Sequence, residues 1–245
     1  MKMSPLTFRE FFRVNESGSF CHEKDVRAFL NLLTKEDKDS LYPYANEEYR
    51  NIFRHTLWMV PGVKEARALS AMLQTHPVFQ HFKVVNVAGD GDQDEESRDA
   101  LEAVEQAIGK NPDATRTITL SCGRLTTGVS VKAWTAVFML SGSYNTAASS
   151  YMQTIFRVQT PATINGRMKE QCYVFDFAPD RALKVIAETA KISSKAGKTS
   201  QSDRKAMGEF INFCPIISID GSQMNRFDVP RMLEQLKRVY VERAP

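Results

Sequence analysis

Residues 56–62 read TLWMVPG, a short apolar run that ends at Pro61-Gly62. A run of this length, bounded by turn residues, is typical of a strand that is buried on both faces. The chain then repeats apolar residues at helical spacing, at Val63, Ala66, Leu69, Met72 and Leu73. The pattern therefore predicts a strand followed by an amphipathic helix that packs on it.

The same alternation continues along the chain. Further strands are predicted at 84–87, 117–120, 136–140 and 172–175, and helices at 101–108 and 147–158. Short buried strands that alternate with helices predict an α/β fold, in which helices flank a parallel sheet.

The two ends of the chain have other patterns. Residues 1–54 predict helices joined by a turn, without a strand. Residues 179–245 are mostly helical in pattern, with one short strand at 216–219 and a positively charged stretch at 181–205. We therefore expect a helical N-terminal extension, an α/β domain over residues 55–178, and a basic C-terminal extension.

Composition excludes several classes of protein. Of the 245 residues, 42% are hydrophobic and 25% charged, which excludes disordered, collagen-like and coiled-coil chains. The net charge of +3 is too small to indicate a polyanionic partner by itself. The longest apolar run, 136–140, is far too short to cross a membrane.

Cysteine and histidine usage gives no sign of a metal site. The four cysteines are scattered without a C-x-x-C pair, and the four histidines have no ligand or triad spacing. Isolated cysteines in a chain of this length are typical of reduced thiols, so we expect a cytoplasmic protein without a membrane partner.

Two segments carry residues suited to binding an anion. Residues 121–130, SCGRLTTGVS, follow a predicted strand at the point where α/β sheets bind ligands, and their glycines, hydroxyls and amides can approach phosphates. Residues 153–161, QTIFRVQTP, place Arg157 among apolar neighbours at the end of a helix. A partly buried arginine there needs an anionic partner.

In this order and spacing, the two segments resemble motifs V and VI of superfamily 2 helicases and translocases, most closely those of restriction-enzyme helicase subunits. Residues 125–130 stand in the place of motif V, and Gln153 and Arg157 match motif VI. Residues 57–62 with the following helix resemble motif IV. The resemblance covers residues 55–177 and implies a RecA-like fold, the second motor domain of an ATP-driven DNA helicase or translocase.

The resemblance also implies roles for residues at the nucleotide. Arg157 would act as an arginine finger on the phosphates of ATP bound with Mg²⁺, and Gln153 would reach the same phosphates. Gly128 and Ser130 would lie near the nucleotide.

A second group of residues would contact DNA. The resemblance implies contacts with backbone phosphates, without reading of sequence, from Ser121, Arg124, Thr127, Pro61 and Gly62.

The sequence departs from the family at several positions. Ser130 replaces the motif V acid, Phe156 replaces the motif VI glycine, and Thr160 replaces its second arginine, for which Arg167 is the nearest spare. The phosphate-loop lysine and the magnesium-binding acidic pair of the first motor domain do not occur in these residues. The resemblance therefore implies an ATP site shared with an N-terminal RecA-like domain of the same parent protein, which would carry nuclease or methyltransferase modules. This chain alone is expected to be inactive.

Other interpretations stay open at this point. Arg157 could pair with a carboxylate such as Asp176 in a purely structural role. The basic stretch 181–205 could serve a catalytically silent nucleic-acid-binding module. A self-contained nuclease is the third alternative, since Asp180, Glu188 and Lys191 resemble a restriction-nuclease metal site in composition but not in spacing.

Overall fold

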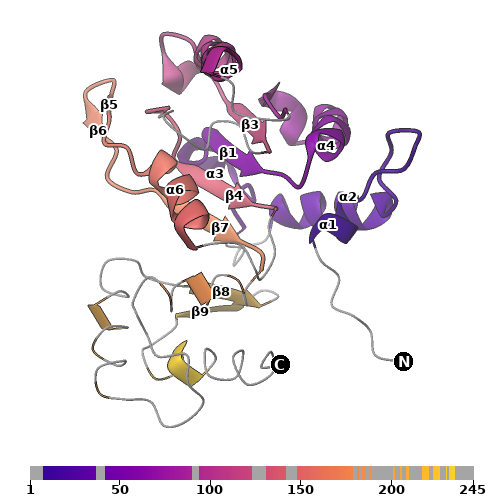
Figure 1. The fold of residues 1–245 in the computed structure, drawn as a ribbon. Coiled ribbons are helices and arrows are strands. Elements are labelled where there is room, and N and C mark those ends of the chain that lie inside the picture. Colours follow the sequence, from indigo (N-terminus) through magenta and orange to yellow (C-terminus); the bar gives the residue numbers. More distant parts are fainter. Residues whose placement is uncertain are drawn as a thin grey trace, which may run out of the picture. The chain divides into compact units, whose positions relative to one another are not determined.

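The computed structural model describes residues 8–36, 42–89, 94–122, 131–141 and 148–178, and beyond them single residues and short strands (Figure 1). The chain divides into two compact units. The first holds residues 1–38, 42–143 and 152–177, and the second holds 39–41, 144–151 and 178–245. Among the helices that the structure describes, none has both the length and the apolar character needed to span a bilayer.

A five-stranded sheet, in the order β2-β3-β1-β4-β7, forms the centre of the first unit. Every neighbouring pair is parallel, and Met59 lies opposite both Ser121 and Met139. The strands are β1 (His55–Met59), β2 (Lys83–Asn86), β3 (Thr117–Ser121), β4 (Ala136–Met139) and β7 (Tyr173–Asp176). The predicted α/β fold with a parallel sheet is therefore confirmed, and all five carboxyl ends lie along one edge.

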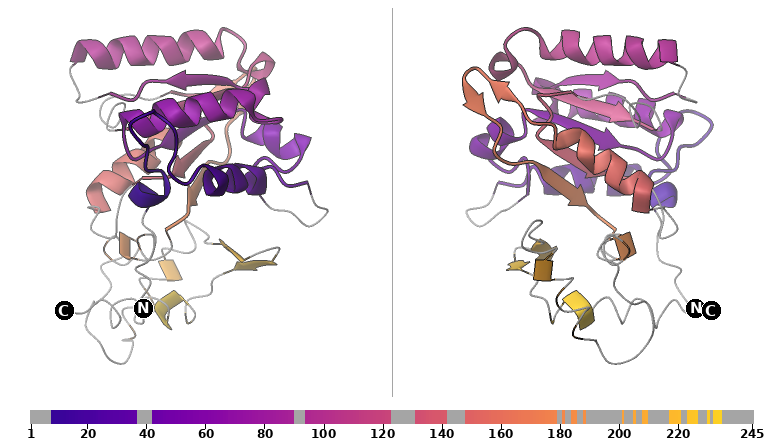
Figure 2. Two further views of the ribbon diagram at one scale, coloured as in Figure 1. Left: turned by 90° about the vertical axis from the view of Figure 1, so that its right-hand side faces the viewer. Right: turned by 60° about the vertical axis from the view of Figure 1, so that its left-hand side comes forward.

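Helices cover the sheet. The helical elements are α1 (Phe8–Phe11), α2 (Glu23–Leu33), α3 (Glu47–Ile52), α4 (Val63–Thr75), η1 (Phe79–His81), α5 (Asp94–Ile108), η2 (Pro112–Ala114) and α6 (Ala148–Val158). Figure 2 shows α4 and α6 on opposite faces of the sheet. Because parallel strands need a crossover between them, the connections that carry α4, α5 and α6 cross a face of the sheet.

Two features differ from the sequence-based expectation. Helix α5 begins at Asp94, well before the apolar stripe that predicted a helix at 101–108. A hairpin of β5 (Thr163–Ile164) and β6 (Arg167–Met168), absent from the prediction, follows α6. Its two turn residues, Asn165 and Gly166, both have positive φ, at 48° and 79°. This pair of values suits the tight two-residue turns that Asn-Gly favours.

The strand predicted at 216–219 lies in the second unit. It is β8 (Ile217–Asp220), which pairs in antiparallel fashion with β9 (Gln223–Arg226). The predicted strand is confirmed, and its partner β9 was not anticipated.

The hydrophobic core lies on one face of the sheet, beneath α2 and α4. Alternate residues of β1, β3 and β4 and the residues directly after β1 and β4 line it: Trp58, Val60, Ile118, Leu120, Ala136, Phe138 and Leu140. The helices contribute Val26, Leu30, Leu33, Ala66, Leu69, Met72 and Leu73. Residues before position 54 therefore share the core of the sheet. The division of the chain at residues 54 and 178 remains a prediction.

Tyr44 lies at the centre of this core. Its ring stacks on Phe138 at 5.7 Å and packs edge-on against Phe79 at 5.0 Å. The Tyr44 hydroxyl lies 3.0 Å from Thr56 Oγ1, which also accepts a hydrogen bond from Trp58 Nε1 at 3.0 Å. Burial raises the pKa of Tyr44 far above its usual value, so the hydroxyl stays neutral.

Two buried histidines join elements that are distant in sequence. His55 Nε2 donates to the Pro112 carbonyl at 2.8 Å, and its Nδ1 lies 2.9 Å from Thr117 Oγ1. His76 Nδ1 accepts from the Val78 amide at 3.2 Å, while its Nε2 lies 3.1 Å from Asn31 Oδ1. Burial lowers the pKa of both imidazoles, so both hold the neutral form.

We expect Tyr44→Ala to lower the free energy of unfolding by about 3–5 kcal/mol, because it opens a cavity at the centre of the aromatic cluster. Tyr44→Phe keeps the ring and leaves Thr56 able to accept from Trp58, so we expect a loss of only about 1 kcal/mol. Urea unfolding followed by circular dichroism measures both. Equal losses for the two variants would contradict the central role of the ring.

We expect stability to fall as the pH drops below about 6.5, because the unfolded chain then binds protons that buried His55 and His76 resist in the folded state. The contribution of the two neutral histidines to the free energy of unfolding is fully present above that pH. It is lost as the pH falls to the lower pKa values that the two histidines have in the folded chain. In His76→Gln the glutamine amide can donate to Asn31 and accept from Val78. This variant should lose less free energy of unfolding between pH 7 and pH 5 than the wild type does. The exposed His81→Gln is the control. Identical pH profiles for wild type and His76→Gln would contradict this account.

Candidate functional site

Helix α6 carries two of the predicted site residues on one face. Gln153 is exposed and Arg157 is partly buried, and their spacing of four places them on the same side of the helix. Tyr151, Thr154 and Val158 are buried on the other side. The two polar side chains can therefore contact the same ligand, while the buried side of α6 packs against the rest of the protein.

Arg157 occupies the last turn of α6. Its Nε lies below the solvent-accessible surface, in agreement with the partial burial expected from its apolar neighbours. Directly before it, Phe156 is 55% exposed at the position where the family has glycine. Thr160, which stands in place of the second family arginine, donates from Oγ1 to the Arg157 carbonyl at 3.4 Å.

The residues directly after 123–130 lie at the amino-terminal edge of the sheet. Thr135 donates its amide to the His55 carbonyl at 3.0 Å and its hydroxyl to the Ile52 carbonyl at 2.7 Å. Val131 accepts from the Trp134 amide at 3.1 Å and is buried. The chain therefore comes out of residues 123–130 into a fixed turn next to the start of β1.

Lys169, which the sequence did not single out, joins this turn to α6. Its ammonium donates to the carbonyls of Val158 at 2.9 Å, Trp134 at 3.1 Å and Lys132 at 3.2 Å. Burial lowers the pKa of Lys169 from its ordinary value. The three carbonyls accept all three protons of the ammonium group. The sequence pattern could not predict this lysine's contacts, because every acceptor is a backbone carbonyl.

A different set of predicted residues lies at the carboxyl edge. Pro61 and Gly62 follow β1 and are partly buried, and Gly62 is the N-cap of α4. Ser121 ends β3, and its carbonyl accepts from the Val60 amide at 2.8 Å. Its side chain is completely buried, so Ser121 faces the interior in the described structure. A side chain added at Gly62 would meet the Glu65 carboxylate.

Four predicted residues, Arg124, Thr127, Gly128 and Ser130, fall outside the residues that the structure describes. Arg167, the spare arginine, is described. It lies on β6 with its side chain 81% exposed and forms an ion pair with Asp113 at 3.1 Å. Asn165 donates to the same carboxylate oxygen at 2.7 Å, and the two bonds together lower the pKa of Asp113, the Asn165 bond most strongly.

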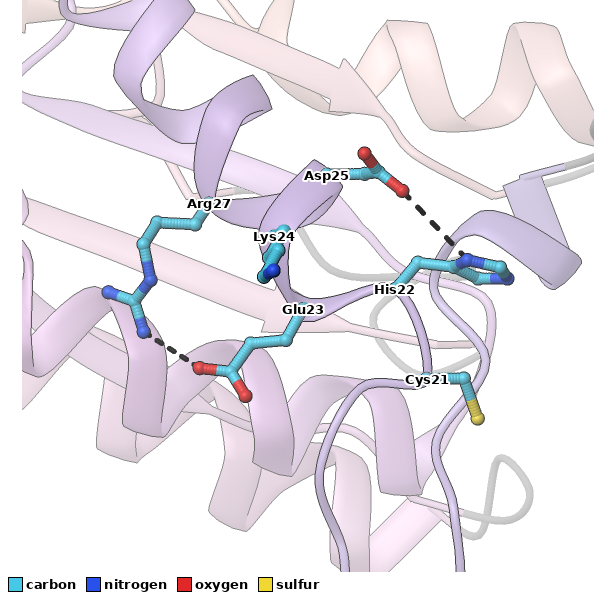
Figure 3. A pocket seen from close by; sticks show the side chains of 6 residues that line it. All are labelled: Cys21, His22, Glu23, Lys24, Asp25 and Arg27. Atoms are coloured by element: carbon cyan, nitrogen blue, oxygen red, sulfur yellow. Dashed lines mark hydrogen bonds and ion pairs between the residues drawn. The ribbon is translucent and has the colours of Figure 1, made fainter.

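One pocket lies away from these residues, at the start of α2 (Figure 3). The residues that line it are Cys21, His22, Glu23, Lys24, Asp25 and Arg27. Arg27 pairs with Glu23 at 2.9 Å, and His22 lies 3.9 Å from Asp25. Its charged groups are largely matched to each other, so the pocket gives no argument for a ligand. Within the described part of the chain, no three His, Cys, Asp or Glu side chains gather as a metal site.

Comparison with known proteins adds one similarity over nearly the whole chain. The chain is 30% identical, over 247 aligned residues, to a Mycoplasma pneumoniae protein described as "Putative type II restriction enzyme and methyltransferase RM.MpnORF110P C-terminus". The match covers 96% of this chain but 33% of the relative, so the chain spans about a third of that protein's length. No family model matches the chain.

Two solved structures show a weaker likeness. The ATP-dependent Type ISP restriction-modification enzyme LlaBIII bound to DNA matches 65% of this chain and 10% of its own, with 16% identity and a TM-score of 0.39. The C-terminal part of the Fun30 ATPase domain matches 94% of this chain and 57% of its own, with 11% identity and a TM-score of 0.38. Scores this low do not support an argument about either family.

We expect Gln153→Ala to change the free energy of unfolding by less than about 0.5 kcal/mol, because the side chain is exposed. Val158→Ala, on the buried side of the same helix, should cost about 1–3 kcal/mol. Urea unfolding of the two variants compares the two sides directly. A large loss for Gln153→Ala would mean that this side of α6 is packed and not open to a ligand.

Proposed function

We propose that this chain is the second, RecA-like motor domain of an ATP-dependent DNA helicase or translocase in a restriction-modification protein. The observation that carries the proposal is α6, which follows β4 of a parallel sheet and presents Gln153 and Arg157 together on one side. The similarity to a protein described as a restriction enzyme and methyltransferase supports it over 96% of the chain.

ATP with Mg²⁺, bound between this domain and an N-terminal RecA-like domain of the parent protein, would supply the driving energy by hydrolysis. Arg157 would donate hydrogen bonds from its guanidinium to the terminal phosphate and stabilise the charge that develops there. Gln153 would orient the same phosphates through its amide. Gly128 and Ser130 would line the nucleotide from the segment that leads to Val131.

Partial burial suits Arg157 to this role. A guanidinium with a covered stem loses less side-chain entropy when it engages a phosphate, because its position is already restricted. The magnesium ligands would come from the N-terminal domain, whose phosphate-loop lysine and acidic pair have no counterpart in these residues.

DNA would bind at the carboxyl edge of the sheet. Pro61 and Gly62 lie there after β1, and residues 123–130, with Arg124 and Thr127, begin there after β3. Backbone amides and small side chains at this edge suit contacts with phosphates that do not read sequence. Ser121, whose side chain is buried, would support this loop from the interior.

We expect Arg157→Ala in the full-length parent protein to lower DNA-dependent ATP turnover by about 10³-fold or more, because it removes the arginine finger. DNA affinity without nucleotide and the unfolding midpoint should stay close to wild type. Steady-state ATPase assays with saturating DNA measure the turnover.

Arg98→Ala is the matched control, since it removes an exposed arginine from α5 and should leave turnover within about twofold. Wild-type turnover in Arg157→Ala would exclude the arginine-finger role. Salt-sensitive DNA binding by a parent protein that hydrolyses no ATP would favour a silent binding module instead.

A further inference from the structure

The ammonium group of Lys169 fills a cage of three backbone carbonyls. The acceptors come from two segments: Val158 ends α6, whereas Lys132 and Trp134 belong to the turn before β4. The Lys169 amide also donates to the Ala162 carbonyl at 2.8 Å, which fixes the lysine's own backbone. A single side chain thus ties the end of one helix to a turn that lies outside that helix.

The position of the cage at the end of α6 gives it strength. The last carbonyls of a helix have no partner within the helix and carry its partial negative charge, so a cation is favoured there. Val158 supplies such a carbonyl, one residue after Arg157. The last turn of α6, with Arg157 in it, would fray more readily without a donor at this carbonyl.

The cage joins the helix that resembles motif VI to the turn that directly follows residues 123–130 in the chain. Residues 123–130 lead directly into the turn at Val131, and Gln153 and Arg157 lie on the helix that ends at Val158. The turn itself is held on its other side, since Thr135 bonds to the carbonyls of His55 and Ile52. The cage therefore sets the end of α6 against a turn that is fixed to β1.

We propose that Lys169 is a positioning residue that holds Arg157 in place relative to the turn at residues 131–135. The proposal rests on the proposed function, because it assigns Lys169 an effect on catalysis that passes through Arg157. Lys169 itself does not touch the nucleotide in this scheme.

The first test uses steady-state ATP hydrolysis by the full-length parent protein with saturating DNA. Lys169→Met keeps the aliphatic stem but removes all three donors, so kcat should fall by about 10- to 100-fold while KM changes little. Lys169→Arg retains a charge and donors and should recover most of the activity. Lys110→Met, which removes an exposed lysine between α5 and η2, is the control and should behave as wild type.

The decisive readout is the double variant Arg157→Ala/Lys169→Met. If Lys169 acts through Arg157, its loss has no further effect once Arg157 is absent, and the double variant matches Arg157→Ala. A further fall in the double variant, or wild-type kcat in Lys169→Met, would overturn the proposal. If the wild-type parent protein showed no DNA-dependent ATP hydrolysis, that result would instead exclude the proposed function, and the catalytic role of Lys169 would be excluded with it.

Hydrogen exchange tests the cage without reference to activity. In Lys169→Met the amides in the last turn of α6 should exchange at least about tenfold faster, and those of β1 should not change. Unchanged exchange at α6 would overturn the positioning role even in an active motor.

Discussion

The parallel pairing of β1 with β3 on one side and β4 on the other is the constraint on which the first unit depends. Parallel neighbours cannot be joined by a tight turn, so the chain must cross the sheet between strands, and helices must cover its faces. Tyr44 anchors β1 from the core through Thr56, which also binds the Trp58 indole. This buried contact holds β1, the central strand of the sheet, in place.

The described residues place the candidate chemistry at two separate edges. Pro61, Gly62 and the end of β3 lie at the carboxyl edge, whereas the end of α6 and the turn at 131–135 meet at the amino edge. Residues 123–130 connect the two edges along the chain. A motor must link events at its nucleotide to events at its track, and in the proposed function these two sites would lie at the two edges of the sheet.

Apolar runs and helical spacing predicted the five strands of the sheet and the helices α4 and α6, because burial on both faces leaves a clear mark in the sequence. Burial of Arg157 also followed from its neighbours. Burial of Ser121 did not, since its polar type suggested a surface loop while β3 lies between two other strands.

The hairpin of β5 and β6 was missed although Asn165-Gly166 signals one, because strands of two residues show no alternation. Lys169 was missed because backbone carbonyls look the same in every sequence.

The two tryptophans of the chain, Trp58 and Trp134, are both completely buried, and both lie in the first unit. Trp58 stacks on Phe138 in the core, whereas the Trp134 carbonyl is one wall of the Lys169 cage. Intrinsic tryptophan fluorescence therefore reports on the first unit, and the second unit, which has no tryptophan, does not contribute to it. With Trp58 replaced by phenylalanine, the remaining indole would be an optical probe built in beside the end of α6.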